Sequence, residues 1–192
     1  MERLRVLIAD DEVLVAEALR EEAQRLGHEV VATAVDGAEA VALAKKLRPD
    51  VAILDVKMPE MDGLAAAQAI IQHEPIPVII VTAFVEDELL ERAGEAGVLG
   101  YLVKPVDETQ LKAALKVAMS RFGELSALRQ EVASLKEALE VRKMVERAKG
   151  ILMHRLQLSE NEAFKKLQKR ARDTNRKLGD VARAIVEASE LL

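Results

Sequence analysis

The chain has 192 residues, of which half are apolar and 32% are charged, so it can bury a core and is not expected to be disordered. It contains no cysteine, which excludes disulfides, thiolate nucleophiles and cysteine–zinc sites. No stretch approaches the roughly 18 consecutive apolar residues of a membrane span. The N-terminus also lacks a small-residue cleavage site, so we expect a cytoplasmic protein that does not contact a membrane.

Charge is divided unevenly along the chain. Residues 1–140 carry 15 Lys and Arg against 26 Asp and Glu, whereas residues 141–192 carry 13 against 7. The two segments therefore have net charges of −11 and +6. An acidic body followed by a small basic segment indicates two functions, and the basic segment suits either a polyanionic partner or simple solvation.

The first 120 residues alternate between short apolar runs and amphipathic segments with helical periodicity. We expect strands at 4–9, 28–33, 51–54, 77–81 and 98–103, and helices near 13–26, 38–47, 64–72 and 86–96. Near-continuous apolar runs indicate strands that are covered on both faces. The predicted fold class is therefore α/β, a doubly wound five-stranded parallel sheet with helices on either side.

A helix is expected to follow Asp107 and to continue for some distance. Apolar residues then recur at spacings of three and four, namely Leu125, Leu128, Val132, Leu135 and Leu139. This stripe indicates either a coiled coil, with a homodimer through residues 122–140, or a helix that packs on its own domain. Three helices should follow, over 141–156, from a capping box at Ser159 and from Leu178. The predicted organisation is a domain at 1–120, a helical coiled-coil linker at 121–140 and a three-helix domain at 141–192.

Polar residues stand where the predicted strands end: Asp10, Asp11, Asp55, Thr82, Tyr101 and Lys104. Ligands of an open parallel sheet bind beyond the carboxyl ends of its strands. Each residue alone has an ordinary explanation, such as a helix cap, a turn or a surface cation. Together, three carboxylates at one rim repel each other and call for a hard divalent cation, Mg²⁺ above all. Carboxylates, Mg²⁺, Lys and Thr are the groups that phosphoryl transfer requires.

These residues, with the segment from Ile53 to Gly63 and the pair Lys104-Pro105, resemble the receiver domain of two-component response regulators over about residues 3–120. The resemblance implies the strand order 2-1-3-4-5. It also implies that a sensor histidine kinase phosphorylates Asp55. The Mg²⁺ would be held by Asp10, Asp11, Asp55 and the backbone carbonyl of Lys57.

The same resemblance implies how the signal would leave the site. Lys104 would pair with one phosphoryl oxygen and the Thr82 hydroxyl would bond another, and Tyr101 would turn into the space that Thr82 vacates. The Lys104–Pro105 peptide bond would be cis. The chain would not be an enzyme beyond catalysing its own phosphorylation and dephosphorylation.

The basic segment contains a glycine within a predicted helix, Gly150, where glycine costs about 1 kcal/mol relative to alanine. Another helix or a ligand should therefore approach the backbone closely there. On the next helix, Lys165, Lys169 and Arg172 share one face. Such a row suits either phosphate contacts or a solvated surface.

The runs Glu146–Met153, Glu162–Phe164 and Asn175–Leu178 resemble the ANTAR family, a small three-helix RNA-binding module of antiterminating response regulators, over about residues 140–187. The resemblance maps the family's RNA contacts to Ala148, Lys149, Gly150, Arg170, Asn175 and Arg176. One position departs from it, because Gln168 stands where the family commonly has arginine. Lys169 or Arg170 is available to replace that contact.

The sequence thus predicts a response regulator whose phosphorylation controls binding to RNA hairpins in nascent transcripts and so prevents termination. Two alternatives differ in the output: a DNA-binding regulator, in which residues 159–187 act as a helix-turn-helix, and a protein-interaction or dimerisation module. A free-standing enzyme is disfavoured, because the sequence has no phosphate-binding glycine loop, no zinc-ligand spacing and no paired nucleophile.

Overall fold

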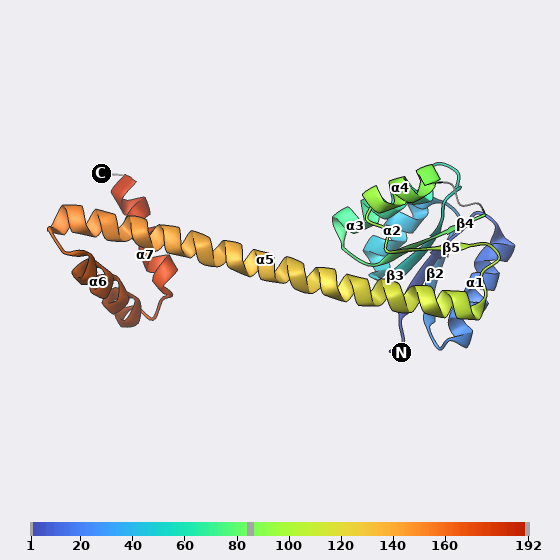
Figure 1. Cartoon of the computed structure of the whole chain (residues 1–192), viewed down its shortest axis with the longest axis horizontal. Coiled ribbons are helices and arrows are strands. Elements are labelled where there is room, and N and C mark those ends of the chain that lie inside the picture. Colours follow the sequence, from blue (N-terminus) through green and yellow to red (C-terminus); the bar gives the residue numbers. More distant parts are fainter. Residues whose placement is uncertain (1, 84–86, 191–192) are drawn as a thin grey trace. The chain divides into compact units, whose positions relative to one another are not determined.

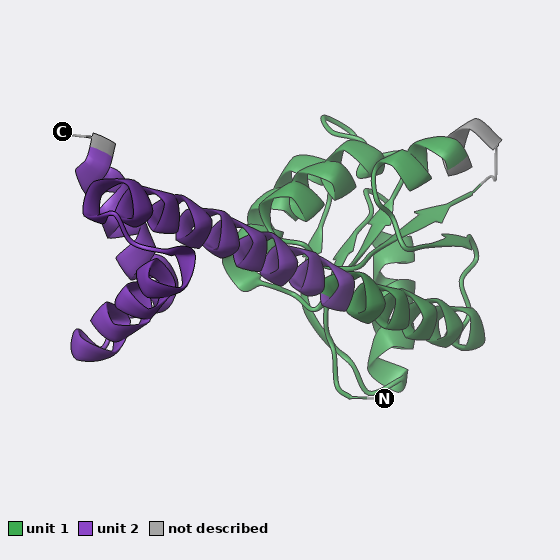
Figure 2. Ribbon diagram, turned by 60° about the vertical axis from the view of Figure 1, so that its left-hand side comes forward, with its two compact units in different colours: residues 1–126 green, residues 127–192 purple. Residues whose placement is uncertain are grey.

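The computed structural model describes residues 2–83 and 87–190 and contains two compact units, Met1–Ser126 and Ala127–Leu192 (Figure 2). The division falls inside helix α5 (Glu108–Leu156), which is one continuous helix of 49 residues (Figure 1). The segment 121–140 and the first helix expected in the basic segment, 141–156, are both parts of α5.

The first unit is built on the predicted five-stranded parallel sheet. Its strands follow the order β2-β1-β3-β4-β5, which confirms the order implied by the resemblance. Asp55 pairs with Val81 and Thr82 pairs with Val103, so β3, β4 and β5 end at the same edge of the sheet. The strands are β1 (Arg5–Ala9), β2 (Glu29–Ala34), β3 (Val51–Asp55), β4 (Val78–Thr82) and β5 (Gly100–Val103).

Helices cover both faces of this sheet, as expected for buried parallel strands. Their bounds agree with the sequence to within one or two residues. The predicted start of the fourth helix, at Glu86, lies outside the described residues. Besides α5, the helices are α1 (Val13–Arg25), α2 (Gly37–Leu47), α3 (Gly63–His73) and α4 (Asp87–Glu95).

Alternation along the strands divides the core into two layers. On β1, Val6 and Ile8 pack with α1 and the start of α5, whereas Leu7 and Ala9 pack with α2 and α3. The same alternation runs through β3 and β4, whose residues are buried throughout. The central strands are thereby fixed in register, which holds their carboxyl ends in place.

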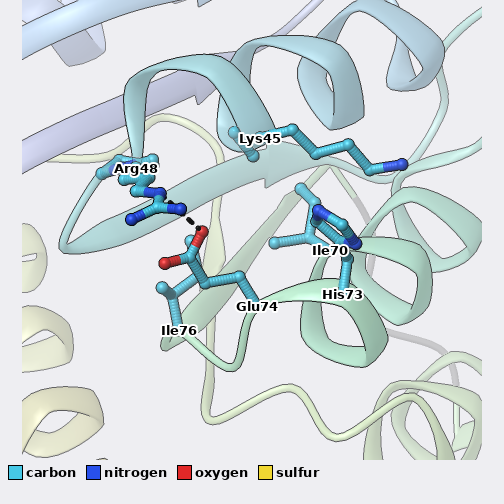
Figure 3. Close-up of a pocket in the computed structure, with 8 residues that line it drawn as sticks. Lys45, Arg48, Ile70, His73, Glu74 and Ile76 are labelled. Atoms are coloured by element: carbon cyan, nitrogen blue, oxygen red, sulfur yellow. Dashed lines mark ion pairs between the residues drawn. The ribbon is translucent and has the colours of Figure 1, made fainter.

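The C-terminal ends of α2 and α3 meet at the opposite edge of the sheet, where the chain enters β3 and β4 (Figure 3). There Arg48 Nε lies 3.7 Å from Glu74 Oε2. The cavity beside this pair measures about 10 Å³, which is room for no more than one water molecule. This edge of the sheet therefore offers no ligand pocket at that position.

The second unit packs the C-terminal part of α5 with α6 (Glu160–Asp173) and α7 (Leu178–Glu190). Ser159 caps α6 with the predicted capping box, since its hydroxyl accepts from the Glu162 N–H and the Glu162 carboxylate accepts from the Ser159 N–H. A side-chain carbon on Gly179 would lie 3.1 Å from a methyl group of Val141, so α7 comes close to α5 there. Within the described ranges, no helix is both long and apolar enough to cross a membrane.

His28 makes folding stability depend on pH. Its ring is buried, and Nδ1 accepts the backbone N–H of Leu4 at 3.2 Å. Burial lowers the pKa of His28 below its usual 6.5. The folded state therefore binds this proton less readily than the unfolded chain.

We expect the free energy of unfolding to be insensitive to His28 above pH 6.5 and to fall as the pH drops below it, by at most about 1.4 kcal/mol per unit. Urea unfolding between pH 5 and pH 8 measures this on wild type and on His28→Asn, whose amide oxygen can still accept the Leu4 N–H. If the two proteins lose stability in parallel, His28 is not the source.

Candidate functional site

The three acids predicted at the strand ends lie together at the carboxyl edge of the sheet. One carboxylate oxygen from each of Asp10, Asp11 and Asp55 lies within 4.8 Å of the others. Asp10 and Asp55 are buried, Asp55 being 6% exposed, whereas Asp11 is open to solvent. The sheet order explains the arrangement, because β1 and β3 are neighbours and deliver their ends side by side.

Lys104 supplies a positive charge at the centre of this cluster. Its Nζ atom lies 2.8 Å from Asp10 Oδ2 and 2.7 Å from Asp55 Oδ1, with Glu12 Oε1 at 3.6 Å. The lysine approaches from the end of β5, and its backbone N–H is bonded to the Thr82 carbonyl at 2.8 Å. The Lys104–Pro105 bond is cis, as the resemblance implies. The sequence predicts the lysine at this edge but not that it bridges two carboxylates.

Backbone donors fix the remaining carboxylate oxygens. Asp55 Oδ2 accepts the Lys57 N–H at 2.7 Å, and Asp10 Oδ1 accepts the Glu12 N–H at 3.0 Å. Charge-assisted bonds of this kind are stronger than bonds between neutral groups. The Asp55 carboxylate is therefore held in one orientation, with one oxygen toward Lys104 and the other toward the turn after β3.

Burial raises the pKa of the Asp55 carboxyl, although the hydrogen bond and charge of Lys104 oppose the shift. Burial also works against the charged form of Lys104, but its bonds to Asp10 and Asp55 outweigh this and raise the pKa of the ammonium. Lys104 therefore stays protonated. A charged Lys104 therefore lies beside the Asp55 carboxylate, which is poorly hydrated.

The donor set at this edge fits a hard divalent cation. Asp10, Asp11 and Asp55 offer oxygen ligands that lie within 4.8 Å of one another, and Mg²⁺ prefers oxygen ligands. A single ammonium does not neutralise these three carboxylates together with Glu12. The backbone carbonyl of Lys57 is also expected to bind the ion. It belongs to the same residue whose N–H donates to Asp55 Oδ2.

Thr82 is the last residue of β4, as expected, whereas Tyr101 is the second residue of β5 and pairs with Ile80, so it does not stand at the predicted strand end. Thr82 is buried at the end of β4, whereas the Tyr101 side chain on β5 is exposed. β4 and β5 pair directly, and Tyr101 lies two residues before the partner of Thr82, so the two side chains are on the same face of the sheet. The structure thus shows Tyr101 in an outward position.

The six residues predicted to contact RNA do not share one surface. Ala148 is fully buried, and its methyl group belongs to the core that α5, α6 and α7 form. Gly150 lies on the exposed side of α5, and a side-chain carbon there would meet nothing within 4 Å among the described residues. Close packing within the chain does not explain this glycine.

Lys149 is engaged within the second unit. It is 8% exposed, and its Nζ atom lies 2.9 Å from Glu146 Oε2 and 2.7 Å from Glu160 Oε1. Hydrogen bonds to Glu160 and Glu146 raise the pKa of Lys149. The ammonium also lies 6.0 Å from the centre of the Phe164 ring. Lys149 joins α5 to the first turn of α6.

The other predicted contacts are open to solvent. Arg170 is on α6, and Asn175 and Arg176 are in the turn between α6 and α7. Asn175 has a φ of 49°, a left-handed conformation that asparagine adopts more readily than most residues. Gln168 is exposed on α6.

The sequence matches the response regulator receiver domain over residues 6–116 and the ANTAR domain over residues 133–186. The chain belongs to the response regulators that carry a C-terminal ANTAR domain. It is 47% identical over 187 residues to the transcriptional regulatory protein PdtaR of Mycobacterium tuberculosis (strain CDC 1551 / Oshkosh), covering 95% of this chain and 89% of that protein.

Solved structures resemble the receiver unit of this response regulator. The receiver domain of the response regulator NarL from Mycobacterium tuberculosis is 37% identical with a TM-score of 0.57, covering 62% of this chain and 98% of that one. CheY in the CheX–CheY–BeF3–Mg complex from Borrelia burgdorferi is 30% identical with a TM-score of 0.57, covering 62% of this chain and 88% of that one.

Gly63 is a residue of the receiver site that sequence reasoning did not single out. A side-chain carbon at this position would collide with the backbone carbonyl of Asp55, while the Gly63 N–H donates to the Val56 carbonyl at 2.9 Å. The start of α3 therefore lies directly against the backbone that carries Asp55. In the sequence, the only indication of this close approach is the position of Gly63 between a turn and the start of a helix.

We expect Gly63→Ala to lower the free energy of unfolding by about 1–3 kcal/mol, because the added methyl displaces either α3 or the Asp55 backbone. Gly94→Ala is the matched control, since Gly94 is within α4 and a side-chain carbon there meets nothing within 4 Å. The control should gain up to about 1 kcal/mol from helix propensity. Equal effects in chemical denaturation would contradict the close approach at Gly63.

Proposed function

We propose that this response regulator accepts a phosphoryl group from a histidine kinase on Asp55 and then regulates transcription termination by binding RNA hairpins through residues 141–192. It would act in the cytoplasm and catalyse nothing beyond its own phosphorylation and dephosphorylation. The observation that carries the first half is the buried Asp55 carboxylate, held between the Lys104 ammonium and the Lys57 N–H.

In the proposed transfer, an Asp55 oxygen attacks the phosphorus of a phosphohistidine. A P–O bond forms as the P–N bond breaks, and the imidazole leaves as a neutral group because its other ring nitrogen carries a proton. Lys104 Nζ is 2.7 Å from Asp55 Oδ1, so the ammonium is already placed to meet negative charge that arrives beside this oxygen. Positioning and electrostatics account for catalysis of this kind.

We assign Asp10, Asp11 and Asp55, with the Lys57 carbonyl, to a Mg²⁺ ion. When bound, the ion screens the repulsion between the anionic nucleophile and the anionic phosphoryl group. The structural relative CheY was crystallised with BeF3 and Mg, which supports this assignment.

The proposed switch runs through Thr82 and Tyr101. A phosphoryl oxygen at Asp55 would draw the Thr82 hydroxyl toward it, and Tyr101 would turn inward from its exposed position. Local charge would in this way change the surface around β4 and β5. The buried Thr82 and exposed Tyr101 are the starting point that this movement requires.

The RNA output is supported by the match to the ANTAR domain and by the +6 charge of residues 141–192. A DNA-binding output is the second candidate, because α6 and α7 are two helices joined by a short turn. The first turn of α7 offers only Asp180 as a charged side chain, which is a poor reader of base edges. The geometry therefore favours RNA.

A homodimer through residues 122–140 is part of the proposal. The apolar stripe of α5 in this region is exposed along its whole length, with Leu135 62% exposed. A stripe with spacings of three and four is the pattern that a second helix covers in a coiled coil. The alternative of packing on the chain's own domain has no support among the described residues, because the stripe residues do not belong to any core cluster.

Replacing the acceptor tests the first half. Asp55→Asn should abolish incorporation of hydroxylamine-labile phosphate from a phosphorylated histidine kinase, and chelation of Mg²⁺ should do the same to wild type. Asp62→Asn is the control, because Asp62 caps α3 through the Ala65 N–H and asparagine caps equally well. Undiminished labelling of Asp55→Asn would place the acceptor elsewhere.

The second half is tested by competition at fixed salt concentration. We expect protein loaded with beryllofluoride, a phosphoryl analogue, to bind RNA hairpins at least tenfold more tightly than unmodified protein. Duplex DNA should compete poorly. The coupling is wrong if both forms bind RNA equally, and the output is wrong if DNA displaces the RNA at equal concentration. Electrophoretic mobility shifts measure both.

A further inference from the structure

The second unit contains a pocket between α6 and α7 whose lining includes two of the predicted RNA contacts, Arg170 and Arg176. Its volume is about 380 Å³, and side chains from α5, α6 and α7 line it. The walls are aliphatic, formed by Leu152, Leu167, Val181 and Ile185. Leu167 and Val181 are buried members of the three-helix core, so the pocket reaches down to that core.

Three basic residues contribute to the lining of this pocket. Lys166 and Arg170, one helical turn apart on α6, and Arg176 in the following turn contribute to its lining, and no acidic residue does. Lys166 and Arg170 are exposed and form no ion pair within the part of the chain that the structure describes. Arg176 Nη2 lies 3.5 Å from the Asp180 carbonyl, which leaves its charge unneutralised.

Lys149 presents the opposite situation. Its ammonium is shared between Glu146 and Glu160 and is largely removed from solvent, so a phosphate would have to displace two carboxylates to reach it. Cations that are already free bind phosphate without that cost. Part of the available positive charge of this unit, on Lys166, Arg170 and Arg176, therefore lies at the apolar pocket.

We propose that this pocket takes one unpaired base from the loop of an RNA hairpin, while Lys166, Arg170 and Arg176 bind the phosphates on either side of it. The inference rests on the proposed RNA output and names the part of the RNA that is read. An apolar wall suits the face of a base, and the adjacent guanidinium groups can also stack on it. Bases within a duplex are covered on both faces, so only a base that has left the stack can enter.

The chemistry distinguishes this occupant from others. A phosphate alone would gain nothing from contact with the four aliphatic side chains. An apolar peptide segment would leave the three cations without an anionic partner. An unstacked nucleotide carries both an apolar face and phosphate charge. The pocket has no aromatic side chain, so contact with the base relies on aliphatic surface and arginine.

The test uses the full-length protein, loaded with beryllofluoride, and hairpins selected by the wild type from a pool with a fixed stem and a randomised loop. Ala184 lines the pocket, and Ala184→Leu fills it with little change in helix propensity. We expect this variant to bind the selected hairpin about tenfold more weakly, which corresponds to about 1.4 kcal/mol. Ala184→Ser, which leaves the pocket open, should bind like wild type.

Abasic substitution then locates the base. One loop position should cost wild type about tenfold in affinity when its base is removed, and the same removal should cost Ala184→Leu almost nothing, because the two changes delete one interaction. Circular dichroism and thermal unfolding establish that the variant is folded.

The cations are tested with charge-matched triple variants. Lys166→Gln, Arg170→Gln and Arg176→Gln together should reduce the slope of log binding constant against log salt concentration by about two. They should also reduce the loss of affinity that removal of the loop base causes. Lys165→Gln, Lys169→Gln and Arg172→Gln remove the same charge from the other flank of α6, and there the abasic penalty should stay as in wild type.

Two results overturn the inference and can be told apart. The pocket does not hold a base if wild type selects a hairpin but Ala184→Leu binds it unchanged. The same conclusion follows if removing the base costs Ala184→Leu as much affinity as it costs wild type. In either case the RNA output stands. If wild type enriches no hairpin from the pool, the proposed RNA output itself is wrong.

Discussion

The receiver unit depends on one buried arrangement of charge, the Lys104 ammonium between the Asp10 and Asp55 carboxylates. Two acids from neighbouring strands cannot be buried together at the end of a sheet without a cation, because their repulsion would protonate one of them. Lys104 meets that need from within the chain. The site is therefore assembled before any ligand arrives, and the orientation of Asp55 is set by the fold.

The strands and helices of the receiver were predictable because each signal is local. Apolar runs identified the strands, and polar residues at their ends identified Asp10, Asp55, Thr82 and Lys104 as neighbours before their distances were known. The sequence predicts a divalent ion that relieves the repulsion, and in the structure Lys104 already does so in part. The contact of Gly63 with the Asp55 backbone was not predictable, since no local pattern reports how closely two segments approach.

In the basic unit, the local sequence pattern predicts which residues are buried but not which of the predicted RNA contacts are accessible. Val145, Ala148 and Leu152 follow one another at spacings of three and four, so helical periodicity alone places Ala148 on the core side, where the structure has it. Gly150 falls on the other side of the helix and is exposed. The pairing of Lys149 with Glu160, eleven positions away on another helix, has no local signature. The sequence therefore predicts that this unit is basic, but it does not predict which of its cations lack a carboxylate partner.

The continuity of α5 has a consequence for dissecting the chain. The same helix contributes Leu111 and Leu115 to the core of the sheet and Val145 and Ala148 to the core of the three-helix unit. A fragment that stops anywhere in 121–140 ends in mid-helix and leaves the last four carbonyl groups without intrahelical partners. The boundary between the two units falls inside α5, so neither unit ends there at a helix terminus. An isolated unit therefore needs a new helix cap before its properties can be compared with those of the intact protein.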